Sequence, residues 1–225
     1  SGKTLSGGIG VTAGSIKLTD TGILASTVLM SGGTTLDADN TLTVSGTLTH
    51  AGDITIDVAG TRTLTYTGTP ISLGEHTLKL MGGGNLLSGG LKINNVNSKL
   101  LLNSITVDNV STTSDSLGLD VDADSTVTSL SVANITPVAI ASGKTLSGAI
   151  TVTAGSIKLD EAGTLASTVE MSGGVLDADE SLTVSGALIQ SGDTTIDVLD
   201  NKTLSYSGAP LSLGSNTLSI VGAGT

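Results

Sequence analysis

Apolar and polar residues alternate along most of this chain. The segment 53–58 reads DITIDV, and 40–46 (NTLTVSG) and 125–132 (STVTSLSV) show the same alternation over most of their length. In a β-strand this spacing puts apolar side chains on one face and polar side chains on the other. The nearest candidate for a helix is 158–168 (KLDEAGTLAST), and Gly163 in its middle argues against one. The pattern therefore predicts an all-β protein built of short strands.

A short motif sets the spacing of these strands. It has the pattern polar-Thr/Ser-Leu-Thr/Ser-x-x-Gly, as in NTLTVSG and KTLSYSG, and turn-forming pairs such as Gly-Gly and Asn-Asn lie between the strands. The interval between leucines is nearly constant along the first copy, at Leu5, Leu24, Leu42 and Leu64. It predicts one turn of a β-helix, at ~20 residues per turn.

The chain also contains a long internal duplication. The opening heptapeptide SGKTLSG, Ser1–Gly7, recurs at Ser142–Gly148, and much of the sequence that follows it recurs as well. The chain therefore divides into a first long repeat, 1–141, with about seven turns, and a partial second repeat, 142–225, for about eleven turns in all. Residues 86–141 have no second copy. We interpret the sequence as about one and a half periods of a longer array, with both repeats continuous in one solenoid.

Such a repeat is expected to fold as a right-handed parallel β-helix. Each turn leaves backbone N–H and C=O groups unpaired at its strand edges, and the next turn pairs with them. Leu, Ile and Val from successive turns stack inside, while Gly and Asn suit the corners. With strands ~4.8 Å apart, about eleven turns form a rod of roughly 50 Å. The alternative is a series of β-sandwich modules, which normally have about seven strands in ~100 residues and an aromatic core anchor.

The composition favours the β-helix over the sandwich. The 225 residues include 31 Gly but no Phe, no Trp and two Tyr, so the core must be aliphatic. The tyrosines stand at equivalent places in the two copies, Tyr66 and Tyr206, as do Met30 and Met171. We expect these four side chains to pack in the core or at corners, with each tyrosine hydroxyl reaching a hydrogen-bond partner.

The negative net charge argues against two classes of binding partner. A net charge of −11, with nine Lys and Arg residues, argues against nucleic acid and against anionic membrane surfaces, because both need clustered basic residues. Cysteine is absent, which excludes disulfides and thiolate metal sites. The sequence contains neither a signal peptide nor an apolar run of transmembrane length, so we expect no membrane insertion in this segment.

One acidic cluster could bind a cation. Asp120, Asp122 and Asp124 alternate, so on one strand all three carboxylates would project together, as oxygen ligands of Ca²⁺. The spacing matches neither the EF-hand loop nor the Ca²⁺-binding nonapeptide of β-rolls. The favoured interpretation is a solvated acidic face, and we expect no cofactor. Two related Asp-Ala-Asp segments are expected in turns, namely Asp37–Asp39 and Asp177–Asp179.

An enzyme is a further hypothesis, because polysaccharide-cleaving enzymes often use β-helices with paired carboxylates. Acid–base chemistry needs a cleft, and sugar binding usually needs aromatic platforms, which this composition lacks. The two histidines, His50 and His76, become Gln190 and Asn216 in the second copy. No Ser-His-Asp or metal-histidine set can be assembled in both copies, so we predict no catalytic residues and no enzymatic activity.

Alternating threonines raise the hypothesis of an ice-binding face. The five threonines of 61–69 (TRTLTYTGT) would project from one side of a strand, as in the threonine rows of ice-binding solenoids. The second copy reads NKTLSYSGA at this place and keeps one of the five. A lattice-matching face would keep methyl and hydroxyl groups in register from turn to turn, so a solvated strand face is the favoured interpretation.

The glycine-rich, aromatic-poor sequence with its NTLTVSG-like units resembles the β-helical passengers of autotransporters and the filamentous-haemagglutinin-type adhesins of bacteria. The resemblance covers essentially the whole chain and is compositional. It implies an extracellular rod at the bacterial cell surface that acts as a surface fibre, an adhesin shaft or a filament subunit. The implied partners are further copies of the chain, stacked end to end or associated laterally, and host or cell-surface glycans or proteins. The alternative function is a Ca²⁺- or glycan-binding module on the same scaffold.

Overall fold

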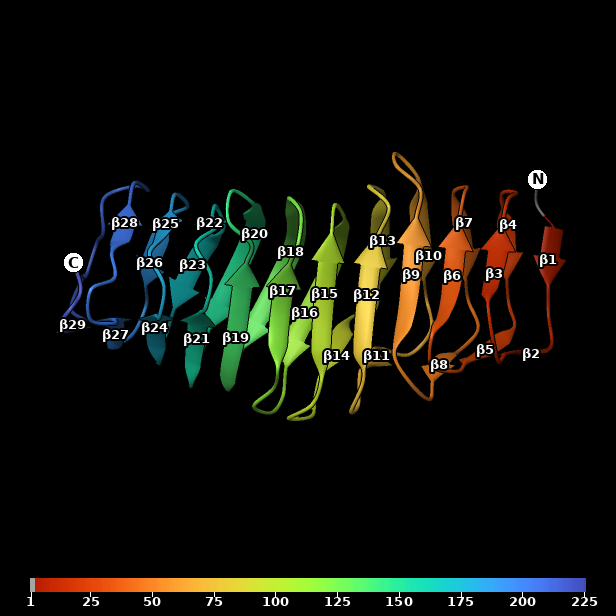
Figure 1. Cartoon of the computed structure of the whole chain (residues 1–225), viewed down its shortest axis with the longest axis horizontal. Coiled ribbons are helices and arrows are strands. Elements are labelled where there is room, and N and C mark those ends of the chain that lie inside the picture. The colour runs from red at the N-terminus through yellow and green to blue at the C-terminus, as the bar shows by residue number, and fades with distance from the viewer. Residues whose placement is uncertain (1–2) are drawn as a thin grey trace.

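The computed structural model describes residues 3–225, and all regular structure in this part of the chain is β-strand. The strands wind into a rod with the N-terminus at one end and the C-terminus at the other (Figure 1). Most turns place strands on three faces, which we call the first, second and third face in chain order. The third face is a sheet of eleven strands, one for each turn.

The strands of the first face are β1 (Lys3–Leu5), β4 (Gly22–Leu24), β7 (Leu42–Val44), β10 (Thr63–Tyr66), β13 (Asn85–Ser88), β22 (Thr164–Leu165), β25 (Leu182–Val184) and β28 (Leu204–Tyr206). Three longer strands continue from the first face onto the second: β16 (Thr106–Thr112), β18 (Ser125–Val132) and β20 (Thr145–Val152). The other strands of the second face are β2 (Gly8–Val11), β5 (Thr27–Met30), β8 (Leu48–His50), β11 (Ile71–Ser72), β14 (Leu91–Ile93), β23 (Thr168–Met171) and β26 (Leu188–Gln190). The third face comprises β3 (Ser15–Leu18), β6 (Thr34–Ala38), β9 (Ile54–Val58), β12 (Thr77–Met81), β15 (Lys99–Asn103), β17 (Gly118–Val121), β19 (Ile135–Ile140), β21 (Ser156–Leu159), β24 (Val175–Ala178), β27 (Thr194–Val198) and β29 (Leu218–Gly222).

Parallel pairing joins each turn to the next. On the third face Lys17 pairs with Asp37, which lies 20 residues later. In a longer turn, the Thr77 N–H donates a hydrogen bond to Asp53, which lies 24 residues earlier. The predicted parallel β-solenoid with ~20 residues per turn is thus confirmed. The sandwich alternative is wrong, because sandwiches of that kind pack two antiparallel sheets.

The rod winds in a right-handed sense. In Figure 1 the strands of the third face, such as β9 and β12, lie nearest the viewer and run upward, and the first-face strands behind them run downward. The chain meanwhile advances from its N-terminal end on the right to its C-terminal end on the left. This combination is a right-handed helix, the hand that crossovers between parallel strands almost always take.

The motif leucines confirm the predicted stacking on the first face and correct one of its registers. Leu5 pairs with Leu24, and Leu42 pairs with Leu64, as their spacing predicts. Leu24, however, pairs with Val44 and not with Leu42, so this turn is longer than the interval between the two leucines. A shift of two residues keeps an apolar side chain facing inward. The period-two pattern alone therefore does not distinguish these two registers.

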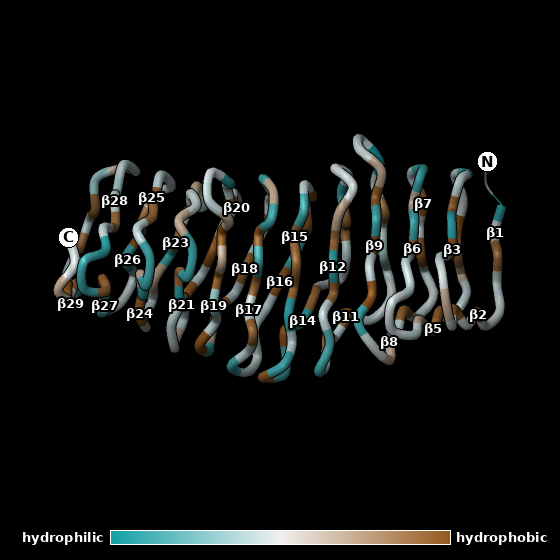
Figure 2. Tube along the Cα trace, viewed as in Figure 1, coloured by the Kyte–Doolittle hydropathy of each residue, from teal (hydrophilic) through white to brown (hydrophobic). Residues whose placement is uncertain are grey.

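A single aliphatic core runs through the rod. One column of this core consists of Ile54, Leu78, Leu100 and Leu119, which pair in succession on the third face and are all at most 3% exposed. Figure 2 shows apolar residues alternating with polar ones along the strands, so the apolar residues can fill the interior while the polar residues face outward. Pairing of β18 with β20 and of β19 with β21 carries this core past residue 141.

The tyrosines seal the core at the corner that follows the first face. Tyr66 is 3% exposed, and its hydroxyl accepts a hydrogen bond from the Leu48 N–H at 3.0 Å. Tyr206 accepts the equivalent bond from Leu188 at 3.2 Å. A Cβ atom on Gly68 would collide with the Tyr66 hydroxyl, so this corner requires glycine. The expected packing role and hydroxyl partner of both tyrosines are confirmed.

The second face changes along the rod. In most turns a corner separates it from the first face. Met30 and Met171 lie on second-face strands and are buried in the core, as expected. In β16, β18 and β20 the strand continues from the first face onto the second. The pairing of β18 with β20 is irregular between Val127 and Leu130, where the longer strands bend.

Candidate functional site

The three aspartates expected on one strand face are divided between a strand and a corner. β17 ends before Asp122, so Asp120 lies on the strand while Asp122 and Asp124 lie in the corner that leads to the first face. The Asp120 carboxylate is 2.5 Å from the Lys99 ammonium group of the preceding turn. Asp124 Oδ1 accepts a hydrogen bond from the Thr145 N–H of the next turn at 2.9 Å. The predicted common projection of the three carboxylates is wrong, because the strand is too short.

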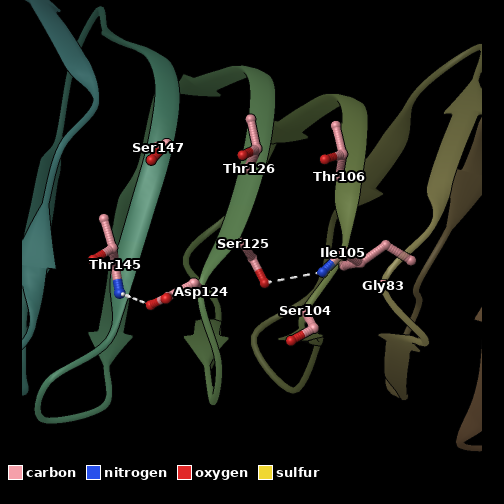
Figure 3. A pocket seen from close by; sticks show the side chains of 9 residues that line it. All are labelled: Gly83, Ser104, Ile105, Thr106, Asp124, Ser125, Thr126, Thr145 and Ser147. Carbon is pink, nitrogen blue, oxygen red and sulfur yellow. Dashed lines mark hydrogen bonds between the residues drawn. The ribbon is translucent and has the colours of Figure 1, made fainter. Parts of the chain in front are cut away.

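An open hollow of about 250 Å³ lies over this corner and the first face (Figure 3). Thr106, Thr126 and Ser147 pair in register across three neighbouring turns and form a row of hydroxyl groups along it. The other lining residues are Gly83, Ser104, Ile105, Asp124, Ser125 and Thr145. Ser125 Oγ is already engaged, since it accepts a hydrogen bond from the Ile105 N–H at 3.3 Å and donates one to the Ala123 carbonyl at 2.9 Å. The hollow offers hydroxyl groups but no aromatic platform and no cationic side chain.

Lysines of the third face bind carboxylates of the next turn. Lys17 Nζ lies 3.0 Å from the carboxylate of Asp37 and 2.8 Å from that of Asp39. In the second copy, Lys158 Nζ lies 2.5 Å from Asp179. Hydrogen bonds to Asp39 and Asp37 raise the pKa of Lys17 to about 12, and the hydrogen bond from Lys17 lowers the pKa of Asp39. Solvent and salt screen these exposed pairs, so they contribute little to stability.

Carboxylates also stack on carboxylates along the third face. Asp37 pairs in register with Asp57, and Asp177 pairs with Asp197. Asp37 and Asp177 lie on β6 and β24, so the prediction that they are turn residues is wrong; these strands extend further than the Asp-Ala-Asp sequence suggests. Burial, followed by neighbouring negative charges, raises the pKa of Asp57 and of Asp177. Burial is also the largest cause of the raised pKa of Asp160.

His50 and His76 meet edge to face, with ring centroids 5.6 Å apart. His50 Nδ1 lies 3.1 Å from the carbonyl oxygen of Gly52, and Nε2 lies 3.1 Å from that of Ser72 in the next turn. In the second copy Gln190 stands in place of His50, and its Nε2 donates to a carbonyl of the next turn at 2.6 Å. His50 thus contacts one backbone carbonyl in its own turn and one in the next turn. Within residues 3–225, no group of three or more His, Asp and Glu side chains is arranged to hold a metal ion.

The five alternating threonines do not form one row. Only Thr63 and Thr65 project from β10, because Thr61 lies in the preceding corner with a φ of 64°. Their partners in the next turn are Asn85 and Leu87. Threonine is therefore not repeated from this turn to the next, which agrees with the favoured interpretation of a solvated strand face.

The ion pairs and the hydroxyl row were not predicted from the sequence. Their signal is the turn length itself, since Lys17 and Asp37 are 20 residues apart, and Thr106 and Thr126 likewise stand one turn apart. A search for complementary charges or matched hydroxyls at intervals of one turn would have found both. Such a search needs the register of each turn. The sequence alone did not show whether Leu24 pairs with Leu42 or with Val44.

No protein-family model matches this chain, and no curated protein or solved structure is significantly similar to it. The resemblance to bacterial surface adhesins therefore stays a prediction. Among residues 3–225, no helix has the length and apolar character needed to cross a membrane. The geometry defines a class of protein, a right-handed parallel β-solenoid with a tandem repeat, whose polar side chains bind neighbouring turns at many positions.

Proposed function

We propose that this chain is a structural rod of an extracellular bacterial surface protein, without catalytic activity, that acts as a stiff spacer, an adhesin shaft or a filament subunit. The observation that supports this proposal best is the single aliphatic core, which passes through both copies of the repeat. The eleven-stranded sheet of the third face runs along the same length. Bending such a rod would open strand pairs and expose core side chains, so the rod resists bending.

The use of the polar side chains supports the same role. Asp120 pairs with a lysine of the preceding turn, Asp124 accepts a backbone N–H of the next turn, and His50 contacts a carbonyl of the next turn. These groups could in principle serve acid–base chemistry or bind a cation. Here they fasten one turn to another, which is what a mechanical element needs.

A Ca²⁺- or glycan-binding module on the same scaffold is the competing proposal. The hydroxyl-lined hollow beside Thr106, Thr126 and Ser147 is the surface such a module would use for a glycan, because hydroxyl groups both donate and accept hydrogen bonds. Asp122 with its neighbours would be the place for Ca²⁺. Titration calorimetry with Ca²⁺ separates the proposals, since saturable heat at a whole number of sites would favour a binding module.

Small-angle X-ray scattering tests the spacer proposal directly. The chain is expected to scatter as a rod of roughly 50 Å, from about eleven turns at ~4.8 Å each. A longer chain that carries residues 1–141 twice before 142–225 should gain about 34 Å, from about seven further turns, at an unchanged cross-section. A gain in width without the gain in length, or a flexible hinge between repeats, would contradict the proposal.

A further inference from the structure

The second face has a gap in its strand pairing between the third turn (β7, β8 and β9) and the fourth turn (β10, β11 and β12). Among the strands of residues 3–225, β8 pairs with β5 alone and β11 pairs with β14 alone. The N–H groups of Ile71 and Leu73 donate to carbonyls of the fifth turn and not of the third. On the first and third faces the same two turns pair normally, β7 with β10 and β9 with β12. Along the second face, the contact between these turns therefore depends on side chains.

Two side chains form hydrogen bonds across this gap. The Tyr66 hydroxyl of the fourth turn accepts a hydrogen bond from the Leu48 N–H of the third turn at 3.0 Å. His50 of the third turn reaches the fourth turn through Nε2, which lies 3.1 Å from the Ser72 carbonyl oxygen. Nδ1 of the same ring lies 3.1 Å from the Gly52 carbonyl oxygen. The imidazole therefore lies between two hydrogen-bond acceptors, one in each turn.

Only the charged form of the ring can satisfy both acceptors. A carbonyl oxygen accepts hydrogen bonds and cannot donate them, and a neutral imidazole carries one N–H, whereas an imidazolium carries two. In the neutral ring, the nitrogen without a proton would direct its lone pair at a carbonyl oxygen 3.1 Å away. Hydrogen bonds donated by a charged group are also the stronger ones. The geometry around His50 thus fits the imidazolium better than the neutral ring.

We infer that His50 is a pH-dependent link between the third and fourth turns. In its doubly protonated form the ring joins the Gly52 carbonyl to the Ser72 carbonyl, and when the ring loses a proton to solvent one of these two hydrogen bonds is lost. Histidine is the side chain whose ordinary change of charge falls between pH 5 and 8. The stabilisation is present where the ring is charged and disappears as the pH rises through this range. The strand pairs of the other two faces remain, so the rod stays folded while this link weakens.

The ionisable groups around His50 carry charges of both signs. β5 and β11 carry no ionisable side chain, and the groups in the adjoining corners and in the fifth turn are Asp53, Glu75, His76 and Lys92. The two carboxylates favour the imidazolium form of His50, whereas Lys92 and a protonated His76 oppose it. These charges act against each other, so the two carbonyl oxygens are what select the imidazolium.

The second copy of the repeat has a pH-independent form of this link. Gln190 stands in place of His50, and Asn216 stands in place of His76. Gln190 Nε2 donates a hydrogen bond to the Thr217 carbonyl of the next turn at 2.6 Å. A side-chain amide keeps its donors at any pH between 5 and 8. The two copies therefore differ in whether this contact between turns responds to protons.

Urea unfolding at pH 5.5 and at pH 8 tests the inference on the wild type, on His50→Gln and on the matched control His76→Asn. Each substitution introduces the residue that the second copy has at that place, so both variants should fold. The wild type should be more stable at pH 5.5, by about fivefold in the unfolding equilibrium constant, which is the value of one hydrogen bond. His50→Gln should lose this difference, and His76→Asn should keep it. The carboxylates are common to all three proteins, so their titration does not affect the comparison.

NMR spectra of the ring N–H protons of the wild type at pH 5.5 provide a measurement that needs no variant. Both ring protons of His50 should exchange slowly with water, because a carbonyl oxygen holds each of them. Rapid exchange of either proton would overturn the inference. So would a pH dependence of unfolding that persists in His50→Gln, or one that disappears in His76→Asn, because the link would then not be His50.

Discussion

The heptapeptide SGKTLSG occurs twice in this molecule, in two different surroundings. Leu5 in the first occurrence is 55% exposed, whereas Leu146 in the second is 0% exposed. The local backbone is nearly the same, since Gly7 and Gly148 have φ angles of 119° and 122°. What differs is the neighbouring turn, because β20 is covered on both sides and β1 on one. In this fold a residue becomes part of the core through the turn next to it, and local sequence only orients it.

The largest predicted effect is the difference in lost stability between alanine substitutions at these two leucines. Leu146→Ala should cost about 2–5 kcal/mol, because it leaves a cavity between two turns. Leu5→Ala should cost less than about 0.5 kcal/mol, as expected at an exposed position. Urea unfolding followed by circular dichroism measures both values. Equal losses at the two positions would show that the local sequence, and not the neighbouring turn, sets the contribution.

The two tyrosines allow the same comparison between a buried and a half-buried copy, because Tyr206 lies near the C-terminal end of the rod and Tyr66 lies inside it. Tyr66→Phe leaves the buried Leu48 N–H without an acceptor and should cost about 1–3 kcal/mol. Tyr206→Phe should cost less, because Tyr206 is only half-buried and water can replace its hydroxyl. Hydrogen exchange at the Leu48 and Leu188 amides, alongside the unfolding midpoint, reports each loss. A larger loss at Tyr206 would contradict the dependence on burial.

A smaller effect is expected from the stacked carboxylates. Burial and negative neighbours raise the pKa of Asp177 in the folded state above its unfolded value, so the fold binds this proton more tightly and loses stability as the pH rises through the folded pKa. Asp177→Asn should therefore stabilise the fold at pH 7, by at most ~0.5 kcal/mol, and have no effect well below the unfolded pKa. Unfolding midpoints over a pH series test this.

Asp179→Asn is the control for that series. It removes the partner of Lys158, so it should not stabilise the fold at neutral pH. If both substitutions stabilise equally, repulsion between these two carboxylates, which also raises the pKa of Asp177, outweighs the ion pair of Asp179 with Lys158.

The smallest effect is expected at the ion pairs that both copies make between neighbouring turns. Lys17→Gln removes the pairs with Asp37 and Asp39, and Lys158→Gln removes the pair with Asp179. Both should lower the unfolding midpoint slightly at low salt, and the losses should vanish at high salt because the pairs are screened. A much larger loss at one of the two lysines, persisting at high salt, would show that the pair is coupled to the core.

Much of this fold could be predicted, because its rules are local and repeated. The period of two identifies strands such as 53–58 and 125–132, and the recurrence of leucine gives a turn of ~20 residues. What the local pattern leaves open is how far each strand extends and which of two registers it takes. The position of Asp37 on β6 is an example of an unpredicted strand end. The pairing of Leu24 with Val44 is an example of an unpredicted register.

The candidate site was less predictable, because its contacts cross between turns. Asp124 was singled out with Asp120 from their alternation, but the strand ends between them and each binds a different neighbouring turn. Thr106, Thr126 and Ser147, whose hydroxyl groups form the row, lie about one turn apart in the sequence, so no short motif contains them. Both features follow only once the register of neighbouring turns is known.

Turn length varies at the corners without disturbing the ladders. The turn from Leu36 to Ile56 is shorter than the turn from Ile56 to Leu80, yet both pairs are in register. Some of the added residues fall in the segment 59–62, which projects between β9 and β10 (Figure 1). The molecule thus has ready positions for insertions. A foreign peptide inserted between Gly60 and Thr61 would be displayed on the side of the rod, at a fixed height along its axis, if Ala59 and Arg62 keep their hydrogen bonds to the neighbouring turns.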